Sequence, residues 1–411
     1  MTISSTEIPE HLRVDFDVYD ESLAGVVDTF SEKLEAVRAV GPVTYSPLYG
    51  GHWIVTGYRE AHEVLRDAEL YSSYPTNLVN AGDGKLIPAE LDAPEHPAFR
   101  QALQPLFSPT RMRALEPEIR ATVNTLIDAF AARGQCEFVE AFAHELPARV
   151  FLSLMGWPLQ DAPMFTEATD AVVFGKPGAT EEESGLARQQ AAQNLFGYFL
   201  TVVADRRTRA VDDITTTIIN TPIKIEGQEP RQLTDDELAR MFFLLLVGGM
   251  HTTQGTLAWS MLHLARNPEQ RQRLIDDPEL IPAAVEEMLR IEAAVSTCRR
   301  ATRDTVLAGV PVRKDDVVLV ILQGANRDPG EFADPADVRI DRTPNRHLSF
   351  GAGPHRCVGS HLARIVIRTA LDEIHRRIPD YRLDPDNPPL WHASQVRGAL
   401  RLPLLFGSVN N

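Results

Sequence analysis

Residues 347–377 read HLSFGAGPHRCVGSHLARIVIRTALDEIHRR, a glycine-rich loop followed by an amphipathic helical pattern. Cys357 stands at the end of the loop, and the helix is predicted to begin near Gly359. Free backbone N–H groups and the dipole at the start of a helix lower the pKa of a thiol and keep its sulfur anionic. Gly351, Gly353 and Gly359 are expected to let the backbone approach the sulfur closely. Cys357 is therefore predicted to be a metal-binding thiolate.

The composition limits the classes of function. A chain of 411 residues with 44% hydrophobic side chains can bury a large ligand. Its 41 basic and 57 acidic side chains give a formal net charge of -16, which argues against nucleic acid or an anionic membrane surface as the main partner. The cysteines Cys136, Cys298 and Cys357 are too few and too widely spaced to suggest a disulfide framework or a zinc site.

The sequence carries no signal of export or membrane insertion. The segment MTISSTEIPEHLRVDFDVYD at the N-terminus is polar and acidic, and it lacks the charged start and apolar stretch of a signal peptide. We therefore expect a cytoplasmic protein. The longest apolar run, residues 241–250, is about half the length that a bilayer requires, so it is interpreted as a buried helix.

Helical patterns dominate from about residue 110 onward. A minor β part is predicted in three regions, each of which carries a strand signal bounded by turn residues. These regions lie near residues 40–60 (HWIVTG at 52–57), 295–323 (VVLVILQ at 317–323) and 390–406 (ALRLPLLF at 399–406). They are too few for a doubly wound sheet. No repeat or linker interrupts the chain, so residues 1–411 are predicted to form one mainly helical domain.

The clearest helix begins with a capping box formed by Thr234 and Glu237, and it is expected to end before Pro268. Two adjacent glycines, Gly248 and Gly249, lie in its middle and weaken it by about 1 kcal/mol each relative to alanine. Either they allow another helix to pack closely, or they leave room beside the backbone for a flat ligand. The sequence leaves both explanations open.

The pattern Phe350-x-x-Gly353-x-His355-x-Cys357-x-Gly359 resembles the haem-binding loop of the cytochrome P450 superfamily, with His355 where arginine is common. The resemblance implies the fold of that superfamily, a triangular helical prism crossed by a long oxygen-binding helix. It also implies haem b as the cofactor, with Cys357 as the axial ligand of the iron. An anionic sulfur on haem iron favours cleavage of the O–O bond, which is monooxygenase chemistry.

Other segments extend the resemblance along most of the chain. Three blocks are most similar to the bacterial camphor 5-monooxygenase-like branch: GQCEFVEAFAHELPARVF (134–151), LLLVGGMHTT (244–253) and IPAAVEEMLR (281–290). In the last block, Glu287 and Arg290 lie three residues apart on one face of a helix. They match the family's Glu-x-x-Arg pair, whose implied role is to lock the core, so both side chains should be buried and paired.

A second group of residues resembles the positions that hold the haem propionates. His96 and Arg100 occur in the segment DAPEHPAFR, and Arg299 and His355 match further positions of this kind. Cationic donors are the groups that carboxylates need. Arg300 leaves the assignment of Arg299 ambiguous by one residue. Each of these side chains could instead lie on the protein surface in contact with solvent.

The long helix carries Gly248-Gly249-Met250-His251-Thr252, which is similar to the family's oxygen-activating signature. Gly248 is implied to lie over the cofactor, and Thr252 is the matching alcohol, whose implied role is to direct a proton so that the O–O bond breaks. Thr252 could instead simply bond to the preceding helical turn. His251 occupies the place of the usual carboxylate. Because histidine titrates near neutral pH, His251 could relay protons. It could also face solvent while waters serve Thr252, or oxygen activation could be altered.

The resemblance projects Leu244, Val247, Gly248, Val295 and Val396 over the haem, which predicts a compact apolar cavity. Eight residues are candidates for lining this substrate pocket. They are Tyr74, Leu86, Ile87, Leu244, Val247, Val295, Gln395 and Val396. The segment YPTNLVNAGDGKLIPAE, which starts at Tyr74, is expected to form a lid, with Gly84 in place of the tyrosine that contacts a substrate ketone in the camphor branch. Gln395 could supply a polar donor instead, alongside Tyr74, Thr76 or Asn77. A terpenoid or aromatic compound with one polar group is therefore a better candidate than camphor.

The resemblance implies O2 as co-substrate and electrons from NAD(P)H, delivered by a ferredoxin reductase and a 2Fe-2S ferredoxin. The candidate docking residues are Arg100, Arg111, Arg113 and Arg364. A monomer is expected. Two other classes of function stay open: a non-catalytic haem protein that senses or carries electrons, and a haem enzyme driven by peroxide. Thr252 and the apolar cavity argue against the first, whereas His251 keeps the second open.

Overall fold

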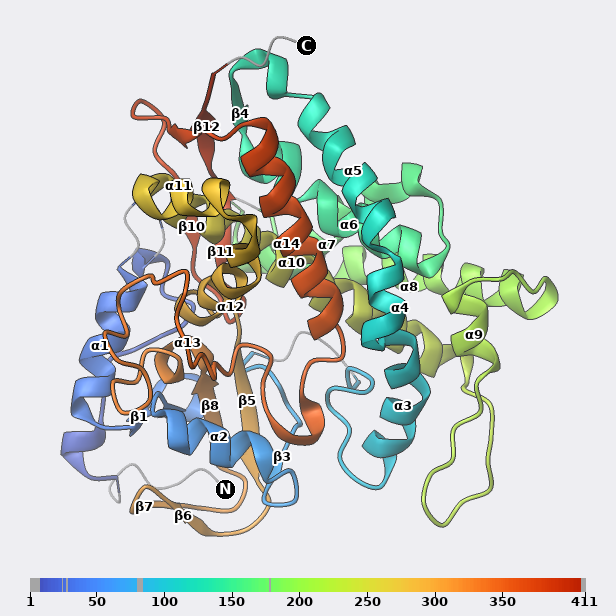
Figure 1. The fold of residues 1–411 in the computed structure, drawn as a ribbon. Helices are drawn as coiled ribbons and strands as arrows, with labels where there is room; N and C mark the ends of the chain where they lie inside the picture. Colours follow the sequence, from blue (N-terminus) through green and yellow to red (C-terminus); the bar gives the residue numbers. More distant parts are fainter. Residues whose placement is uncertain (1–7, 24, 27–28, 80–83, 177–178, 408–411) are drawn as a thin grey trace.

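In a computed structural model, the described residues are 8–23, 25–26, 29–79, 84–176 and 179–407. They form a mainly helical structure with four small sheets, as the sequence predicted (Figure 1). The helices are α1 (Phe30–Val40), α2 (Tyr58–Arg66), α3 (Glu95–Leu103), α4 (Pro109–Ala114), α5 (Glu116–Asp128), α6 (Glu145–Met155), α7 (Ala162–Phe174), α8 (Glu181–Thr208), α9 (Ile214–Asn220), α10 (Asp235–Arg266), α11 (Pro268–Asp276), α12 (Ile281–Ile291), α13 (Leu322–Ala325) and α14 (Ser360–Arg377). The strands are β1 (Val43–Ser46), β2 (His52–Val55), β3 (Tyr71–Ser72), β4 (Gln135–Glu137), β5 (Ser296–Ala301), β6 (Thr305–Leu307), β7 (Val310–Val312), β8 (Val317–Ile321), β9 (Arg382–Leu383), β10 (Leu390–His392), β11 (Gly398–Arg401) and β12 (Pro403–Leu405).

The largest sheet has five strands in the order β1-β2-β8-β5-β3. β2 pairs with β8 in parallel, and the other neighbours in this sheet are antiparallel. The strand predictions at 52–57 and 317–323 are therefore confirmed, and the two strands lie side by side although more than half of the chain separates them.

The strand prediction at 399–406 is wrong in one respect, because this segment forms two strands. β11 pairs with β10, whereas β12 pairs with β4 and β9. Between them, the N–H of Leu402 donates a hydrogen bond to the Glu137 carboxylate, and its carbonyl accepts one from the N–H of Phe138. The chain therefore passes from one small sheet to another at Leu402.

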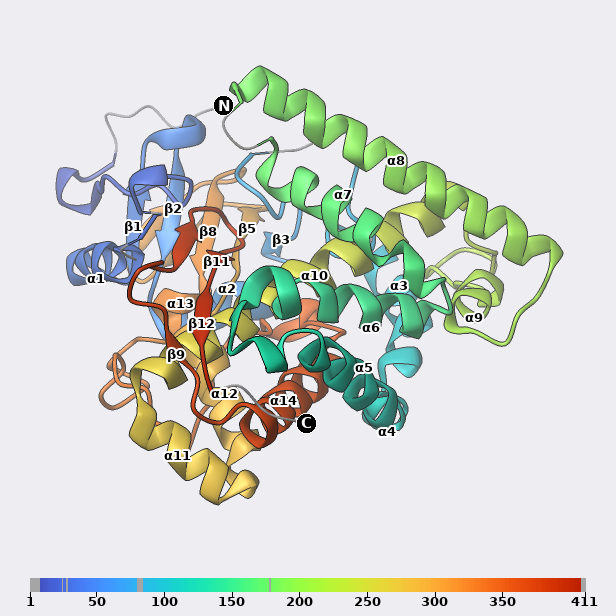
Figure 2. The same ribbon diagram turned by 90° about the horizontal axis from the view of Figure 1, so that it is seen from above.

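Two helices, α10 and α14, lie between a sheet-rich side of the molecule and a helical side. Figures 1 and 2 both show β1, β8, α1 and α2 on one side and α3 to α9 toward the other. α14 packs against α10, α12 and α5, and α8 crosses α7 and α10, as seen in Figure 2. The loop that precedes α14 therefore lies close to where the two sides meet.

The long helix α10 has the predicted ends. The Thr234 hydroxyl accepts a hydrogen bond from the N–H of Glu237, and the Glu237 carboxylate accepts one from the N–H of Thr234. The helix spans 32 residues and stops immediately before Asn267 and Pro268. The apolar run at 241–250 lies inside it, as predicted. Within the described parts of the chain, no helix is both long enough and apolar enough to cross a membrane.

Candidate functional site

The loop around Cys357 turns tightly before α14. A short 3-10 turn at Gly353–His355 is followed by Cys357, whose N–H donates a hydrogen bond to the carbonyl of Phe350 (2.8 Å). α14 begins at Ser360 with Gly359 as its N-cap, so the prediction of a helix starting near Gly359 is confirmed. Cys357 is exposed. The chain therefore presents an accessible sulfur just before the start of a long helix.

The electrostatics at Cys357 correct one expectation. Although solvent reaches Cys357, protein surrounds it closely, and the resulting loss of hydration raises the pKa of its thiol. A backbone hydrogen bond from Gly359 and the charges of Arg100, Arg356 and Arg364 lower the pKa. The net direction is upward, so the predicted lowering by the helix start is present but smaller than the cost of burial. A metal cation bound to the sulfur supplies the missing positive charge, because a coordinating thiol loses its proton.

The glycines of the loop differ in what they do. A Cβ on Gly359 would lie 3.9 Å from the Cys357 sulfur, so this backbone does approach the sulfur. Gly353 has a φ of +69°, and a Cβ there would lie 2.6 Å from the carbonyl oxygen of Leu65 in α2. Gly353 therefore allows the loop to pack closely on α2, a contact that the sequence did not predict. Gly351, with a φ of +68°, has no neighbour within 4 Å of such a Cβ.

Four of the predicted propionate-binding residues gather in one cluster. The rings of His96 and His355 lie 3.8 Å apart between centroids. Burial, followed by the charges of Arg100 and Arg299, lowers the pKa of His96 to about 4, although Asp92 opposes this. Burial, His96, Arg299 and Arg100 lower the pKa of His355 to about 3, and its Nδ1 is buried with no hydrogen-bond partner. Such a cluster lacks the negative charge that two carboxylates would supply, so it fits haem propionates.

Only one of the two adjacent arginines, Arg299 and Arg300, belongs to this cluster. Arg299 is buried, burial lowers its pKa to about 10, and it acts on both histidines. Arg300 lies over the ring of Tyr74 instead, with 5.8 Å between its guanidinium carbon and the ring centroid. Arg100 donates a hydrogen bond to the carbonyl of Arg356 (2.6 Å), directly before Cys357 in the chain. Arg299 is therefore better placed than Arg300 to bind a haem propionate.

Gly248 and Gly249 border open space on α10. A methyl group placed on either would meet no protein atom within 4 Å, apart from the helix's own backbone. On the same helix, a methyl group on Gly255 would lie 2.9 Å from the carbonyl oxygen of Arg397. Close packing therefore explains Gly255 and not the Gly248-Gly249 pair, which leaves room for a flat ligand. This open backbone fits the haem that the Cys357 loop implies.

Thr252 lies one turn beyond Gly248 on α10. Its hydroxyl donates a hydrogen bond to the Gly248 carbonyl at 2.8 Å, so the local bond to the preceding turn is present. A hydroxyl that donates in this way keeps its lone pairs available to accept a hydrogen bond. The side chain is partly exposed. Thr252 can therefore hold a donor from the open side without breaking its bond to the helix.

His251 is buried against α7, so the alternative in which it faces solvent is wrong. Its exposed fraction is 4%, and its Nε2 lies 2.9 Å from Oδ1 of Asp170. The Nε2 of His144 lies 3.0 Å from the same oxygen. Although burial acts in the opposite direction, the hydrogen bonds from His144 and His251 lower the pKa of Asp170 to about 2. Asp170 is therefore ionised at neutral pH and shared by two imidazoles.

Gln395 does not offer the pocket a free polar group, which corrects another expectation. Its Oε1 accepts hydrogen bonds from the Tyr19 hydroxyl (2.7 Å) and the N–H of Leu78 (2.6 Å). Its Nε2 donates to the carbonyl of Ser296 (3.1 Å). The amide is thus engaged at both ends, and it ties the N-terminal segment and the predicted lid to β5.

The described part of the predicted lid is organised by a buried acid, and residues 80–83 lie outside the described residues. The Glu90 carboxylate accepts hydrogen bonds from the N–H and hydroxyl of Thr76 (both 2.9 Å) and from the N–H of Leu86 (2.8 Å). The Thr76 hydroxyl is therefore already engaged. Gly84 has a φ of +118°, and the Arg240 guanidinium fills the space that a side chain would need.

Two of the predicted pocket residues are brought together from distant segments. Val295 and Val396 form an isolated antiparallel bridge, and both are partly buried. Leu244 and Val247 are partly buried on α10, in the turn before the open glycines. Ile87 is buried in the main hydrophobic core.

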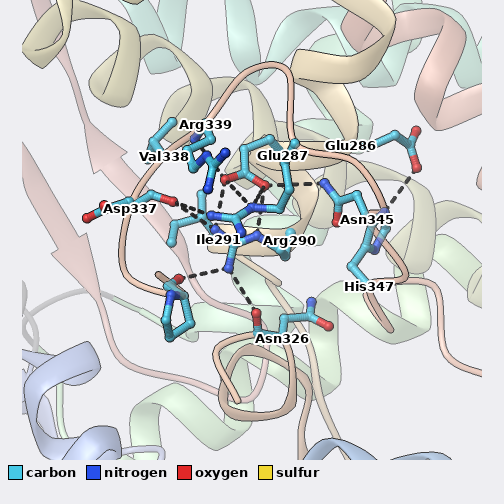
Figure 3. Close-up of polar contacts among 12 residues, drawn as sticks. Glu286, Glu287, Arg290, Ile291, Asn326, Asp337, Val338, Arg339, Asn345 and His347 are labelled. Atoms are coloured by element: carbon cyan, nitrogen blue, oxygen red, sulfur yellow. Dashed lines mark hydrogen bonds and ion pairs between the residues drawn. The ribbon is translucent and has the colours of Figure 1, made fainter. Parts of the chain in front are cut away.

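The predicted pair of Glu287 and Arg290 is buried and joined by two hydrogen bonds. Both side chains have no exposed surface, and the guanidinium donates to the carboxylate at 2.7 and 2.8 Å (Figure 3). Arg290 also donates to the carbonyls of Asn326 (2.9 Å) and Pro335 (2.8 Å), and Glu287 also accepts from Arg342 (3.0 Å). The expectation of burial and pairing is confirmed. The pair ties α12 to the segment that leads into the thiolate loop.

The neighbouring acid Glu286 holds the loop from its other side. Its carboxylate lies 3.0 Å from His347, as Figure 3 shows, and accepts hydrogen bonds from Arg364 of α14 at 2.6 and 2.7 Å. Arg364 is therefore already paired, which weakens it as a docking residue. Arg111 and Arg113 of α4 are exposed.

Sequence reasoning missed Asp170, His144, Glu90 and Glu286. No motif marks Asp170 in the segment TEATDAVVF, which carries it to α7. The only sign of Asp170 in the sequence was indirect: His251 occupies the place of the usual carboxylate of the oxygen-activating helix, so a carboxylate from elsewhere could be sought. The answer depends on two helices that meet in space, with 81 residues of chain between the partners.

Comparison with known proteins gives a consistent result. The family described as Cytochrome P450 matches residues 183–277 and 275–378. The probable cytochrome P450 127A1 of Sinorhizobium fredii is 35% identical, over 89% of this chain and 87% of its own length. The mycinamicin IV hydroxylase/epoxidase of Micromonospora griseorubida is 33% identical, over 95% of this chain and 97% of its own. The crystal structure of CYP101C1 is similar with a TM-score of 0.87 at 32% identity, over 98% of this chain and 100% of that one.

Proposed function

Because this chain belongs to the cytochrome P450 family and is a haem-thiolate monooxygenase, we propose that it inserts one oxygen atom from O2 into a small, mostly apolar substrate. A terpenoid or an aromatic compound is the substrate class that fits best. Two of the four predicted polar donors, Gln395 and Thr76, are engaged within the protein, which favours an apolar substrate over one recognised through hydrogen bonds.

The residues around the cofactor have distinct proposed roles. The haem, when bound, supplies the iron at which O2 is bound and reduced. The Cys357 thiolate would hold the iron, and Phe350, Gly353 and Gly359 shape its loop. The cluster of His96, Arg100, Arg299 and His355 would hold the propionates, with the positive charge supplied by its two arginines.

The open face of α10 at Gly248 and Gly249 is the observation that carries this proposal. An electron carrier needs the thiolate but no space above the iron, whereas an oxygenase needs room for O2 and substrate. Thr252 borders this space and can accept a hydrogen bond from a water there. His251, fixed by Asp170, is then placed to pass a proton toward Thr252.

Electrons are proposed to come from NAD(P)H through a ferredoxin reductase and a 2Fe-2S ferredoxin. Arg111 and Arg113 project from α4, and Arg356 is exposed directly before Cys357. An acidic protein that docks on these arginines would approach the cofactor from the thiolate side. The attraction between such charges falls as salt rises, so reduction by ferredoxin should slow at high ionic strength.

The first test is the difference spectrum of the reduced, carbon monoxide-bound protein. The red-shifted band from which the family takes its name should appear, and its absence would contradict a functional thiolate. Small terpenoids and aromatics are then screened for a shift in the spin state of the haem. A response to charged or strongly polar compounds alone would contradict the proposed substrate class.

A further inference from the structure

We propose that Asp170 is a positioning residue for proton delivery, and that Asp170 and His251 together replace a carboxylate on the oxygen-activating helix. This inference rests on the proposed function, in which His251 passes a proton toward Thr252. The acid lies on α7, where its carboxylate contacts the histidine of α10, and 39% of its side chain is exposed.

The contact geometry fixes which nitrogen of His251 carries the proton. Asp170 is ionised at neutral pH, because its pKa is lowered to about 2, so its oxygen can only accept a hydrogen bond. The Nε2 of His251, 2.9 Å from that oxygen, must therefore be the donor. In neutral His251 the remaining nitrogen, Nδ1, is then a base with a free lone pair. That nitrogen is buried and has no hydrogen-bond partner within the protein.

An acid behind an imidazole is an arrangement that suits proton transfer. The carboxylate orients the ring, holds one tautomer and stabilises the imidazolium that forms when the other nitrogen takes a proton. In this role Nδ1 of His251 takes a proton from a water molecule and then gives it up toward the water beside Thr252, and Asp170 stays ionised throughout. Because Nδ1 is buried, the Phe174 ring packed on His251 must shift to admit that water. The ring returns to its starting state, so one proton is passed on and none is lost.

The charges explain how a histidine can stand where a carboxylate is expected. Protonated His251 beside ionised Asp170 has no net charge, and neutral His251 beside ionised Asp170 has one negative charge. A carboxylic acid and its carboxylate have the same two charge states. The pair therefore avoids bringing a net positive charge next to the oxygen site, which a lone histidine would do.

Two further histidines affect the charge of the pair. His144 shares the Asp170 carboxylate, so the pair is balanced while His144 is neutral, and protons on both His144 and His251 leave one net positive charge. Burial opposes a charge on His144, but its hydrogen bond to Asp170 and the carboxylates of Asp170, Glu145 and Glu137 raise its pKa. Burial, His251 and Arg397 lower the pKa of His392 to about 3, so that ring is neutral near pH 7.

The ring of Phe174 contacts the rings of both His251 and His392. Its ring meets the ring of His251 edge-on, with centroids 5.0 Å apart, and the ring of His392 at 4.4 Å. Its side chain comes from the last residue of α7, four residues beyond Asp170. The acid and the aromatic ring that cover His251 therefore belong to one helix turn.

The test uses Asp170→Asn, which keeps the shape of the side chain and removes its charge. Asp161→Asn is the matched control, because Asp161 precedes the same helix and accepts a hydrogen bond from Tyr198 (2.8 Å) rather than from a histidine. The first measurement is nitrogen NMR of the full-length, carbon monoxide-bound protein labelled in its histidines, with the His251 signal identified by its loss in His251→Asn. The wild type and D161N should show one tautomer, protonated at Nε2, and D170N should show a mixture. A wild-type proton on Nδ1, or an unchanged signal in D170N, would overturn the proposal.

The second measurement is product formed per NAD(P)H consumed across pH, with the compound that gives the largest spin-state shift in the wild type. We expect a fall of at least about fivefold in D170N and no fall in D161N. The double variant D170N/H251D returns a carboxylate to α10 without setting two acids face to face, so it should recover most of the loss. A loss that the double variant does not recover would show that Asp170 only supports the packing of α7. A wild type without the red-shifted band would defeat the proposed function itself, whereas a D170N protein with unchanged band, tautomer and yield would defeat this inference alone.

Discussion

The thiolate side and the oxygen side of this molecule are built in different ways. On the thiolate side, the segment that leads into the Cys357 loop is held by a buried ion pair, Glu287 and Arg290, whose residues are three apart on one helix. On the oxygen side, His251 depends on Asp170, which comes from another helix. The first arrangement depends on residues that form short sequence motifs. The second exists only after α7 and α10 have packed together.

The largest effect is expected from Cys357→Ser. A hydroxyl at the start of α14 keeps the size of the side chain but cannot supply the anionic sulfur that favours O–O cleavage. Monooxygenase activity should be lost, and the carbon monoxide difference spectrum should lose its red-shifted band. Cys136→Ser is the control, because Cys136 lies in β4, and its spectrum should equal that of the wild type. A red-shifted band in the Cys357 variant would mean that another group ligates the iron.

A large loss of stability is expected from Glu287→Ala. The substitution leaves the guanidiniums of Arg290 and Arg342 buried without their carboxylate, and removal of one partner from a buried pair costs about 3–5 kcal/mol. Urea unfolding should report this loss as a lower midpoint, with earlier release of haem. Glu69→Ala removes an exposed pair with Arg303 and should cost about 1 kcal/mol or less. Equal losses would contradict the role of the buried pair as a lock.

Features that depend on residues close together in the sequence could be predicted, and features that depend on distant residues could not. The capping box at Thr234, the helix after Gly359 and the Glu287–Arg290 pair were predictable, because each depends on residues a few positions apart. The engagement of Gln395 by Tyr19 was not, because 376 residues separate them and no local pattern reports on that contact. The same holds for the acid behind His251. The predicted lowering of the Cys357 pKa failed for a different reason, since helix-end effects can be estimated from sequence and burial cannot.

Two glycines of α10 offer a comparison within one helix. Gly248→Ala should raise the free energy of unfolding of the haem-free chain by up to about 1 kcal/mol, because alanine favours a helix and the new methyl group meets no protein atom. Gly255→Ala should lower it by about 1–3 kcal/mol, because the methyl group would press on the carbonyl oxygen of Arg397. Urea unfolding of the two haem-free variants gives the signs, and haem titration should show weaker binding for Gly248→Ala. A loss of stability in Gly248→Ala would mean that Gly248 is also a packing glycine, and a gain in Gly255→Ala would mean that Gly255 is not one.

The smallest effect concerns pH and His144. The pKa of His144 is raised in the folded protein, so its pairing with Asp170 contributes stability that is fully present below the unfolded pKa, about 6.5, and is lost as pH rises through the folded value. His144→Gln should therefore destabilise the protein more near pH 6 than near pH 9, by about 1 kcal/mol or less. His361→Gln is a suitable control, because burial and neighbouring arginines lower the pKa of His361 and so give the opposite sign. If His144→Gln cost the same at both pH values, folding would leave the pKa of His144 unchanged, and Asp170 would not stabilise a charge on it. Asp170 would then share its charge with His251 alone, and the oxygen side would depend on a single imidazole.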